Sequence, residues 1–349
     1  MRLPSRSALH FGLLAVGLAA IALLVVGCDA RSAPASIFIS ESPEARAIRD
    51  LGVLLGIVAL VVVAGVEIVL FVAILRGLHK PADSVKQVHG NARLEIAWTV
   101  ITAVVFFIIF GLTVKTMIDV TADPAGASPL QSAFPNDTVV MRSTGWRWWW
   151  AFEYPALGVV TANEVYVPTD KPTLVELRSG DVIHSWWVPR LSGKMDMVPG
   201  RTNYVTFVAT APGAYQGFCA EFCGSEHARM GFRVVAVSVQ EFSAWAKAQK
   251  ASAAEPQTDA EKAGQRAFAG TCAACHTIRG TAAAGKIGPD LTHFGSRTSL
   301  AAETLPNTPE NVSKWLTDPQ RVKPANLMPN QNLSAEVIQQ LVAYLSILK

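Results

Sequence analysis

Cysteine, histidine and charge are all scarce in this sequence. Only 16% of its 349 residues are charged and the formal net charge is +3, a balance too mild to support nucleic-acid binding. Seven histidines are too few for a histidine-rich catalytic domain, and five cysteines are few enough to be assigned one by one. Charge is scarce because three long apolar runs occupy residues 1–115, whereas the remainder has the composition of soluble domains. The length leaves room for two or more of them.

The N-terminus is predicted to be a signal. Residues 1–27 begin with a basic stretch and continue into a short apolar core, which ends just before Cys28. This ending resembles a bacterial lipobox, so cleavage would leave Cys28 as a lipidated N-terminus, with residues 28–48 as a periplasmic tether. The alternative is an uncleaved third span with a buried free cysteine.

Two longer apolar runs, Leu51–Leu75 and Ile96–Val114, can each cross a bilayer. At about 1.5 Å per residue they span roughly 37 and 28 Å. Basic residues between the runs place that loop in the cytoplasm, so residues 49–115 are predicted to form a transmembrane helical hairpin. Glu67 lies within the first run, where an ionisable group usually faces protein or water. Glu95 lies just before the second run, where the helix dipole alone favours a carboxylate.

After a linker at residues 116–136, the pattern over residues 137–245 indicates a β domain. Short segments rich in β-branched and aromatic residues are separated by Gly, Pro and Asn clusters about every ten residues, which predicts an antiparallel β-sandwich or barrel. Such a scaffold can hold metal ligands on the loops at one end. The clearest strand segments are Thr138–Arg142, Glu164–Val167, Thr173–Arg178, Tyr204–Ala209 and Phe232–Val239.

The most informative segment gathers two thiols, an imidazole and a thioether within twelve residues: Cys219, Cys223, His227 and Met230. Soft sulfur with imidazole selects copper, zinc or iron–sulfur. Two cysteines four residues apart could bridge two metal ions, which indicates a binuclear copper centre for electron transfer. Zinc is the main alternative, but methionine does not suit it. His184 is the remaining outward-facing histidine of this domain and is therefore expected to be a further ligand.

Cys272, Cys275 and His276 form the Cys-x-x-Cys-His signature of c-type haem attachment. In an exported protein, paired cysteines ordinarily form disulfides, but histidine at ligand spacing favours haem here and metal in the earlier pair. Met328 is the sole methionine downstream, and a His/Met axial pair suits electron transfer. His293 is the rival distal ligand.

The haem segment is predicted to be a separate all-α domain. Residues 246–257 are small and polar and are expected to form a linker, with part of it extending a helix. Thr258–Glu261 matches a capping box that opens a helix, and Ser334–Leu348 reads as a closing amphipathic helix with Ser334 as its N-cap. Together with Gly288–Leu291, these features make residues 258–349 resemble a class I cytochrome c.

The hairpin and β domain, from Ile48 to Trp245, resemble subunit II of haem–copper cytochrome c oxidases. The resemblance rests on Asn91–Thr99, Trp146–Tyr154, Asp181–Trp186 and the cysteine loop. It implies a multi-domain membrane protein in which a two-helix transmembrane hairpin is followed by an all-β cupredoxin-like domain. The added cytochrome c domain is that of a caa-type oxidase.

In that family a binuclear copper A centre is held by two His, two bridging Cys, one Met and one backbone carbonyl. The resemblance assigns these to His184, Cys219, Cys223, His227, Met230 and the carbonyl of Glu221. It implies that the Glu221 carboxylate binds magnesium at the interface with subunit I. It also places Trp148 where electrons enter and Glu95 at the mouth of a proton path.

The resulting prediction is an electron-relay subunit in a bacterial inner membrane, with its copper and haem domains on the periplasmic side. The implied partners are oxidase subunits I and III, membrane lipid, and cytochrome c or a quinol–cytochrome c reductase as donor. Subunit I would reduce dioxygen and pump protons. The alternative is a membrane-anchored periplasmic copper-binding or chaperone protein with a c-type haem. A quinol oxidase subunit would have no reason to keep the cysteines, and a nitrous oxide reductase needs a histidine-rich copper domain that this sequence does not contain.

Overall fold

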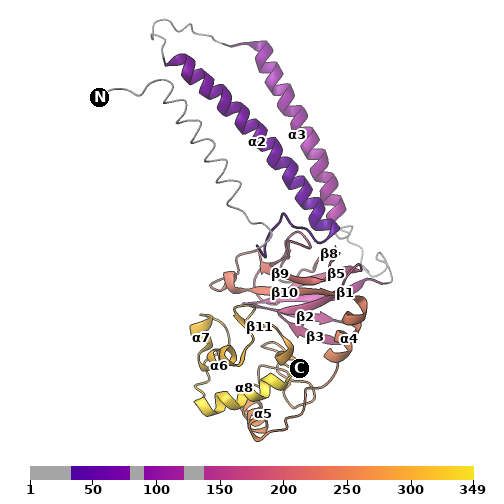
Figure 1. The fold of residues 1–349 in the computed structure, drawn as a ribbon, viewed down its shortest axis with the longest axis vertical. Helices are drawn as coiled ribbons and strands as arrows, with labels where there is room; N and C mark the ends of the chain where they lie inside the picture. Colours follow the sequence, from indigo (N-terminus) through magenta and orange to yellow (C-terminus); the bar gives the residue numbers. More distant parts are fainter. Residues whose placement is uncertain (1–32, 79–89, 122–136) are drawn as a thin grey trace, which may run out of the picture.

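The computed structural model describes residues 33–78, 90–121 and 137–349. The predicted signal, Cys28 and most of the loop between the two apolar runs lie outside these ranges. Three parts follow one another along the long axis: a helical hairpin, a β-sandwich and a helical domain (Figure 1). The predicted order of parts is therefore seen in the described residues.

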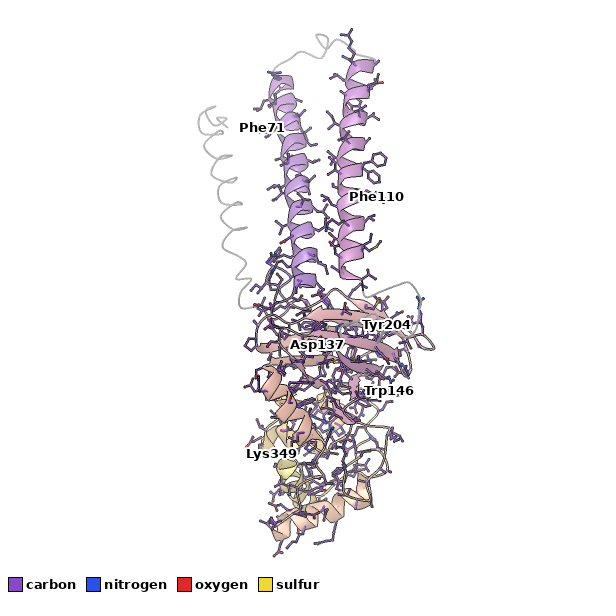
Figure 2. The ribbon with its side chains drawn as sticks, turned by 90° about the vertical axis from the view of Figure 1, so that its right-hand side faces the viewer. Phe71, Phe110, Asp137, Trp146, Tyr204 and Lys349 are labelled. Atoms are coloured by element: carbon purple, nitrogen blue, oxygen red, sulfur yellow. The ribbon has the colours of Figure 1, made fainter. Side chains whose placement is uncertain are left out.

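The hairpin consists of α2 (Pro43–Gly77) and α3 (Ala92–Val120), both long and apolar enough to cross a membrane. Its apolar side chains, Phe71 and Phe110 among them, are exposed along nearly the whole length (Figure 2). Both helices begin earlier than the apolar runs because polar caps precede them. The Asn91 side chain accepts the N–H groups that open α3.

The start of α2 is attached to the β-sandwich. The Ser42 hydroxyl caps the helix by accepting the N–H of Ala45 at 2.9 Å, and it donates to the carbonyl of Leu191 at 2.6 Å. Two residues further, Glu44 accepts the N–H of Val208 at 3.3 Å. These contacts orient the hairpin relative to the domain that carries the cysteine loop.

The β domain is a sandwich of two five-stranded sheets. In the first sheet the order is β3 (Val159–Ala162), β2 (Trp149–Tyr154), β1 (Val139–Trp146), β5 (Pro172–Ser179) and β8 (Asn203–Val208). In the second it is β4 (Glu164–Pro168), β10 (Gly231–Val237), β9 (Gly213–Cys219), β6 (His184–Trp187) and β7 (Met195–Met197).

The prediction of a purely antiparallel sandwich is wrong for two strand pairs. Strands β1 and β5 pair in parallel, as do β4 and β10. Strands joined by a short hairpin must run antiparallel, but these partners are far apart in sequence and meet only after the chain has crossed between sheets. Alternation of apolar residues marks the buried face of each strand and carries no information on its direction.

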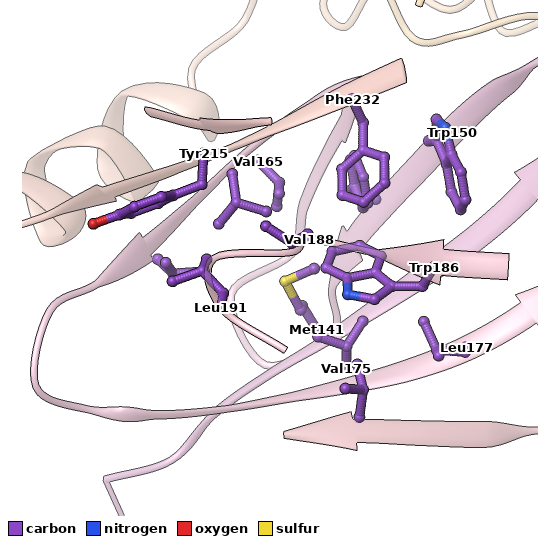
Figure 3. Close-up of a cluster of buried hydrophobic side chains, with 14 of the residues drawn as sticks. Met141, Trp150, Val165, Val175, Leu177, Trp186, Val188, Leu191, Tyr215 and Phe232 are labelled. Atoms are coloured by element: carbon purple, nitrogen blue, oxygen red, sulfur yellow. The ribbon is translucent and has the colours of Figure 1, made fainter. Parts of the chain in front are cut away.

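Large aromatic side chains fill the space between the sheets (Figure 3). Along β2 every second residue is buried, so part of the aromatic block Trp146–Tyr154 is a core strand. The ring centroids of Trp186 and Phe232 lie 4.4 Å apart, and those of Trp150 and Phe232 lie 4.7 Å apart. Such aromatic pairs contribute about 1 kcal/mol each beyond the area they bury, which makes this a rigid base for the adjoining loops.

The C-terminal domain contains α5 (Asp259–Thr271), α6 (Pro309–Thr317), α7 (Pro319–Val322) and α8 (Ala335–Ile347), with a short pair of strands, β11 (Ser299–Leu300) and β12 (Leu305–Pro306). The predicted capping box at Thr258 and the N-cap at Ser334 are confirmed. Helices α5 and α8 pack closely because Gly264 lacks a side chain: a Cβ there would lie 2.1 Å from the carbonyl oxygen of Gln340. Helix α4 (Val239–Gln249) runs into the predicted linker.

Candidate metal and haem sites

The cysteine loop and the remote histidine meet at one end of the sandwich. Cys219 ends β9, and His184 begins the neighbouring strand β6, so the pairing of these strands brings the two residues together. The Sγ atom of Cys219 lies 3.9 Å from Nδ1 of His184 and 3.7 Å from Sγ of Cys223. All three side chains are buried, and their donor atoms fall within 4.8 Å of one another.

The second thiol has its own pair of donors. The Sγ atom of Cys223 lies 3.7 Å from Nδ1 of His227 and 3.7 Å from Sδ of Met230. On the other side, the carbonyl oxygen of Glu221 lies 3.2 Å from Sγ of Cys219. Each thiol is thus accompanied by one imidazole and one weaker donor. This donor set suits a pair of soft metal ions that share two thiolates, as copper does.

Asp181 orients the remote histidine, a role that sequence reasoning missed. Its Oδ1 lies 2.8 Å from Nε2 of His184, which leaves Nδ1 facing the thiols. Burial lowers the pKa of His184, but hydrogen bonding to Asp181 and Cys219 outweighs burial and raises it. Burial likewise raises the pKa of Asp181, and hydrogen bonds from His184 and two backbone N–H groups lower it overall. The sequence feature that could have indicated this role is the acid three residues before the histidine.

The two thiols share a proton. Their contact lowers the pKa of Cys219 to about 3, with help from His184, and together with burial it raises the pKa of Cys223. Thiols bind metal as thiolates, so loading this site must release protons.

The haem signature lines a cavity in the C-terminal domain. Cys272, Cys275, His276 and Met328 all border this cavity, and both thiols are free. The Nδ1 atom of His276 lies 2.8 Å from the carbonyl oxygen of Pro289, which leaves Nε2 for a ligand. Burial lowers the pKa of His276 and so favours the neutral imidazole that binds iron. Two thiols, a neutral imidazole and a thioether fit a covalently attached haem.

The rival ligand His293 lies elsewhere. It is buried, does not border the cavity, and places Nε2 3.2 Å from the carbonyl oxygen of Gln249 at the end of α4. Its place is structural, where the cytochrome domain meets α4, so the alternative that it is the distal ligand is wrong in this structure.

Trp148 adjoins both sites. Its indole Nε1 donates to the carbonyl oxygen of Cys223 at 3.1 Å, and the residue borders the cavity that holds Cys272 and His276. Trp150, two residues further, is fully buried in the sandwich core and donates to the carbonyl of Met230 at 3.2 Å. Trp148 differs from Trp150 because it contacts the metal loop and also borders the haem cavity.

The two acids assigned by resemblance both lie at the surface. The Glu221 carboxylate is 43% exposed, with Oε2 3.9 Å from Nζ of Lys194. Glu95 is exposed at the start of α3, and its Oε1 accepts the N–H of Asn91 at 3.2 Å. Their roles in binding magnesium and admitting protons remain predictions.

Three family models match the chain in succession. They are described as "Cytochrome C oxidase subunit II, transmembrane domain" for residues 34–114, "Cytochrome C oxidase subunit II, periplasmic domain" for residues 158–237, and "Cytochrome c" for residues 261–349. The matches follow the order of hairpin, sandwich and helical domain seen in the structure.

Individual relatives carry two different names. Cytochrome c oxidase subunit 2 of Alkalihalophilus pseudofirmus is 37% identical over 88% of this chain and 89% of its own. Cytochrome c oxidase subunit 2 of Bacillus subtilis is 36% identical over 76% of this chain and 77% of its own. Quinol oxidase subunit 2 of Bacillus spizizenii is 30% identical over 67% and 71%. Because overall similarity extends to both kinds of oxidase, the residues of the site must identify the electron donor.

Proposed function

The chain belongs to the cytochrome c oxidase subunit II family, and from this membership we propose that it receives electrons at a covalently bound haem c and passes them through a binuclear copper A centre to subunit I. As a subunit of this kind it is a component of a haem–copper terminal oxidase. The bound copper pair and haem would each supply one-electron redox chemistry. The protein supplies their ligands and the contact between the two sites.

One observation carries this proposal: Trp148 both donates its indole N–H to the metal loop and borders the haem cavity. The hydrogen bond to the Cys223 carbonyl fixes the ring against a residue that we propose as a bridging ligand. Buried aromatic neighbours hold the rest of the loop. A fixed path of this kind needs no rearrangement when an electron moves.

The proposed ligands have separate tasks. Cys219, Cys223, His184 and His227 would be the strong ligands of the copper pair. Met230 and the carbonyl of Glu221, which lie against the same two sulfurs, would be the weak ligands. In the haem cavity, Cys272 and Cys275 would form the thioether bonds, with His276 and Met328 as axial ligands.

The site also favours this function over the alternatives. A quinol oxidase subunit needs neither the paired thiols nor the haem signature. A copper chaperone must release its metal, whereas here both thiols, Met230 and His184 are buried and His184 is held by Asp181. We further propose that both domains lie on the periplasmic side of the membrane, with oxidase subunits I and III as partners. Glu221 at a magnesium site and Glu95 at a proton path belong to the same proposal.

Metal and haem analysis of the purified full-length protein tests the proposal. We expect two copper ions and one covalent haem per chain, and a copper resonance spectrum in which one unpaired electron is shared by two nuclei. One zinc ion, or a copper signal confined to one nucleus, would contradict the relay. The matched control is Cys219→Ser, which should lose the copper signal and keep the haem.

A further inference from the structure

Lys323 is a buried cation at the boundary between the haem domain and the copper domain. It follows α7, and only 2% of the residue is exposed. Its Nζ atom donates to three backbone carbonyl oxygens: those of Trp148 at 2.7 Å, Arg229 at 2.7 Å and Ala301 at 2.9 Å. An ammonium group has three N–H donors, so this geometry satisfies all of them.

The three carbonyls belong to different parts of the molecule. Trp148 adjoins the metal loop, and Arg229 immediately precedes the proposed ligand Met230. Ala301 belongs to the haem domain, as does Lys323 itself. A buried lysine is costly unless its donors are paired. The arrangement is therefore specific to one docked orientation of the two domains, in which the lysine crosses the boundary beside Trp148.

Other contacts close the same boundary independently of Lys323. The Thr298 hydroxyl donates to Oε2 of Glu164 at 2.5 Å, and the Thr298 N–H donates to the same atom at 3.0 Å. The N–H of Gly231, at the start of β10, donates to the carbonyl of Ala302 at 3.2 Å. The haem domain thus adjoins the sandwich through backbone and side-chain contacts at several points, and two amide protons report on whether it stays docked.

From this geometry, and resting on the proposed function, we propose that Lys323 is a positioning residue that locks the haem domain over Trp148 for electron transfer within the chain. Lys323 borders the haem cavity, but its ammonium group donates to backbone carbonyls and to none of the proposed ligands. It acts by holding the backbone of Trp148 and that of Arg229 against the haem domain. Without it the docked orientation would be one of several.

Hydrogen exchange of the full-length protein loaded with haem and copper gives the first test. The amide protons of Thr298 and Gly231 are bonded across the boundary. We expect both to exchange slowly, at rates comparable with amides inside the haem domain. Exchange as fast as that of exposed loops would show that the domains are not docked in this way, and it would overturn the inference even if no variant can be made.

The second test replaces the lysine by an uncharged side chain of similar length, Lys323→Met, with the exposed haem-domain lysine in Lys314→Met as control. We expect electron transfer from reduced haem to copper to slow by about tenfold, because hydrogen bonds to a charged group are the strong ones. The amide hydrogen-exchange rates of Thr298 and Gly231 should increase in the same variant. Haem and copper content should stay unchanged, as should every property of the control.

An unchanged transfer rate and unchanged exchange in Lys323→Met would overturn the positioning role. That failure is distinct from failure of the proposed function. Absence of copper or haem from the parent protein would remove the relay itself, while the exchange measurement would still report on the docked boundary.

Discussion

The indole N–H of Trp148 donates to the carbonyl oxygen of Cys223 across 75 residues of sequence, with Nε1 and O separated by 3.1 Å. The carbonyl of Trp148 itself accepts from Lys323, 175 residues away. One residue is therefore held by its ring to the metal loop and by its backbone to the haem domain.

Trp148→Phe keeps an aromatic ring at the boundary and removes the N–H. We expect slower haem-to-copper electron transfer, with both cofactors retained. The lost hydrogen bond should lower the free energy of unfolding by about 1 kcal/mol. Rapid-mixing kinetics and denaturant unfolding measure the two effects. Trp150→Phe is the control, since it alters the core but not the haem cavity; equal slowing in both variants would argue against a special place for Trp148.

Asp181→Asn should weaken copper binding by about 10- to 100-fold, because outer-shell partners of a ligating histidine orient it and raise its basicity. The Asp181 carboxylate is bonded to Nε2 of His184. Competition with a copper chelator measures the affinity. Asp196→Asn removes an exposed acid of the same domain and should bind copper normally. Equal affinity in the two variants would mean that Asp181 does not orient the ligand.

Met328→Ala should lower the haem potential while the haem stays attached. Loss of the thioether ligand is expected to shift the potential by on the order of 0.1 V, within the roughly 0.8 V range that axial ligands cover. Redox titration followed by absorbance measures it. The control is Lys314→Ala, an exposed residue of the same domain that does not border the haem cavity, which should leave the potential unaltered. An unchanged potential in Met328→Ala would show that Met328 is not bound.

Docking of the haem domain is expected to weaken as the pH rises from about 5 to 7. Burial at the boundary raises the pKa of Glu303 to about 7 from an ordinary 4.5, while Arg233 on β10 lowers it and Glu164 on β4 raises it further. Gln216 on β9 also contacts this carboxyl group. The docked form thus holds a proton that the undocked form has lost. Its stabilising contribution, about 3 kcal/mol, is complete below pH 4.5 and is lost as the pH passes through 7.

Hydrogen exchange at Thr298 and Gly231, corrected for intrinsic rates, measures this change. In Glu303→Gln the protection of these amides should be flat over the same interval. Burial also lowers the pKa of Lys323 to about 7 from 10.5, which affects docking only at higher pH and with the opposite sign. Identical pH profiles for the parent and Glu303→Gln would exclude Glu303 as the cause.

Sequence reasoning found the residues whose chemistry is written in short motifs. The cysteine loop and the haem signature needed only spacing, and His184 followed from counting outward-facing histidines. The structure brings these residues together as expected, because a strand end and a loop between strands are local features. The two long helices begin before the apolar runs, at the polar caps Ser42 and Asn91, because hydrophobicity alone does not mark the start of a helix.

Other features depend on segments that meet only in the folded chain. The parallel pairing of β1 with β5 leaves no trace in either strand. Lys323 stands among prolines and polar residues and reads as a solvated lysine, and its burial becomes apparent only when two domains are placed against each other. Asp181 was visible beside His184, but its role required the geometry of the ring.

The short connection from Gln249, where α4 ends, to Asp259, where α5 begins, has a consequence for competition between donors. A tether of this length holds the haem domain near its docking face at an effective concentration on the order of millimolar. A freely diffusing donor at micromolar concentration cannot displace it from Trp148. An external donor is therefore expected to deliver its electrons at the outer face of the haem domain. The donor concentration at which turnover saturates should then reflect binding of the donor to the haem domain, and not binding at the copper loop.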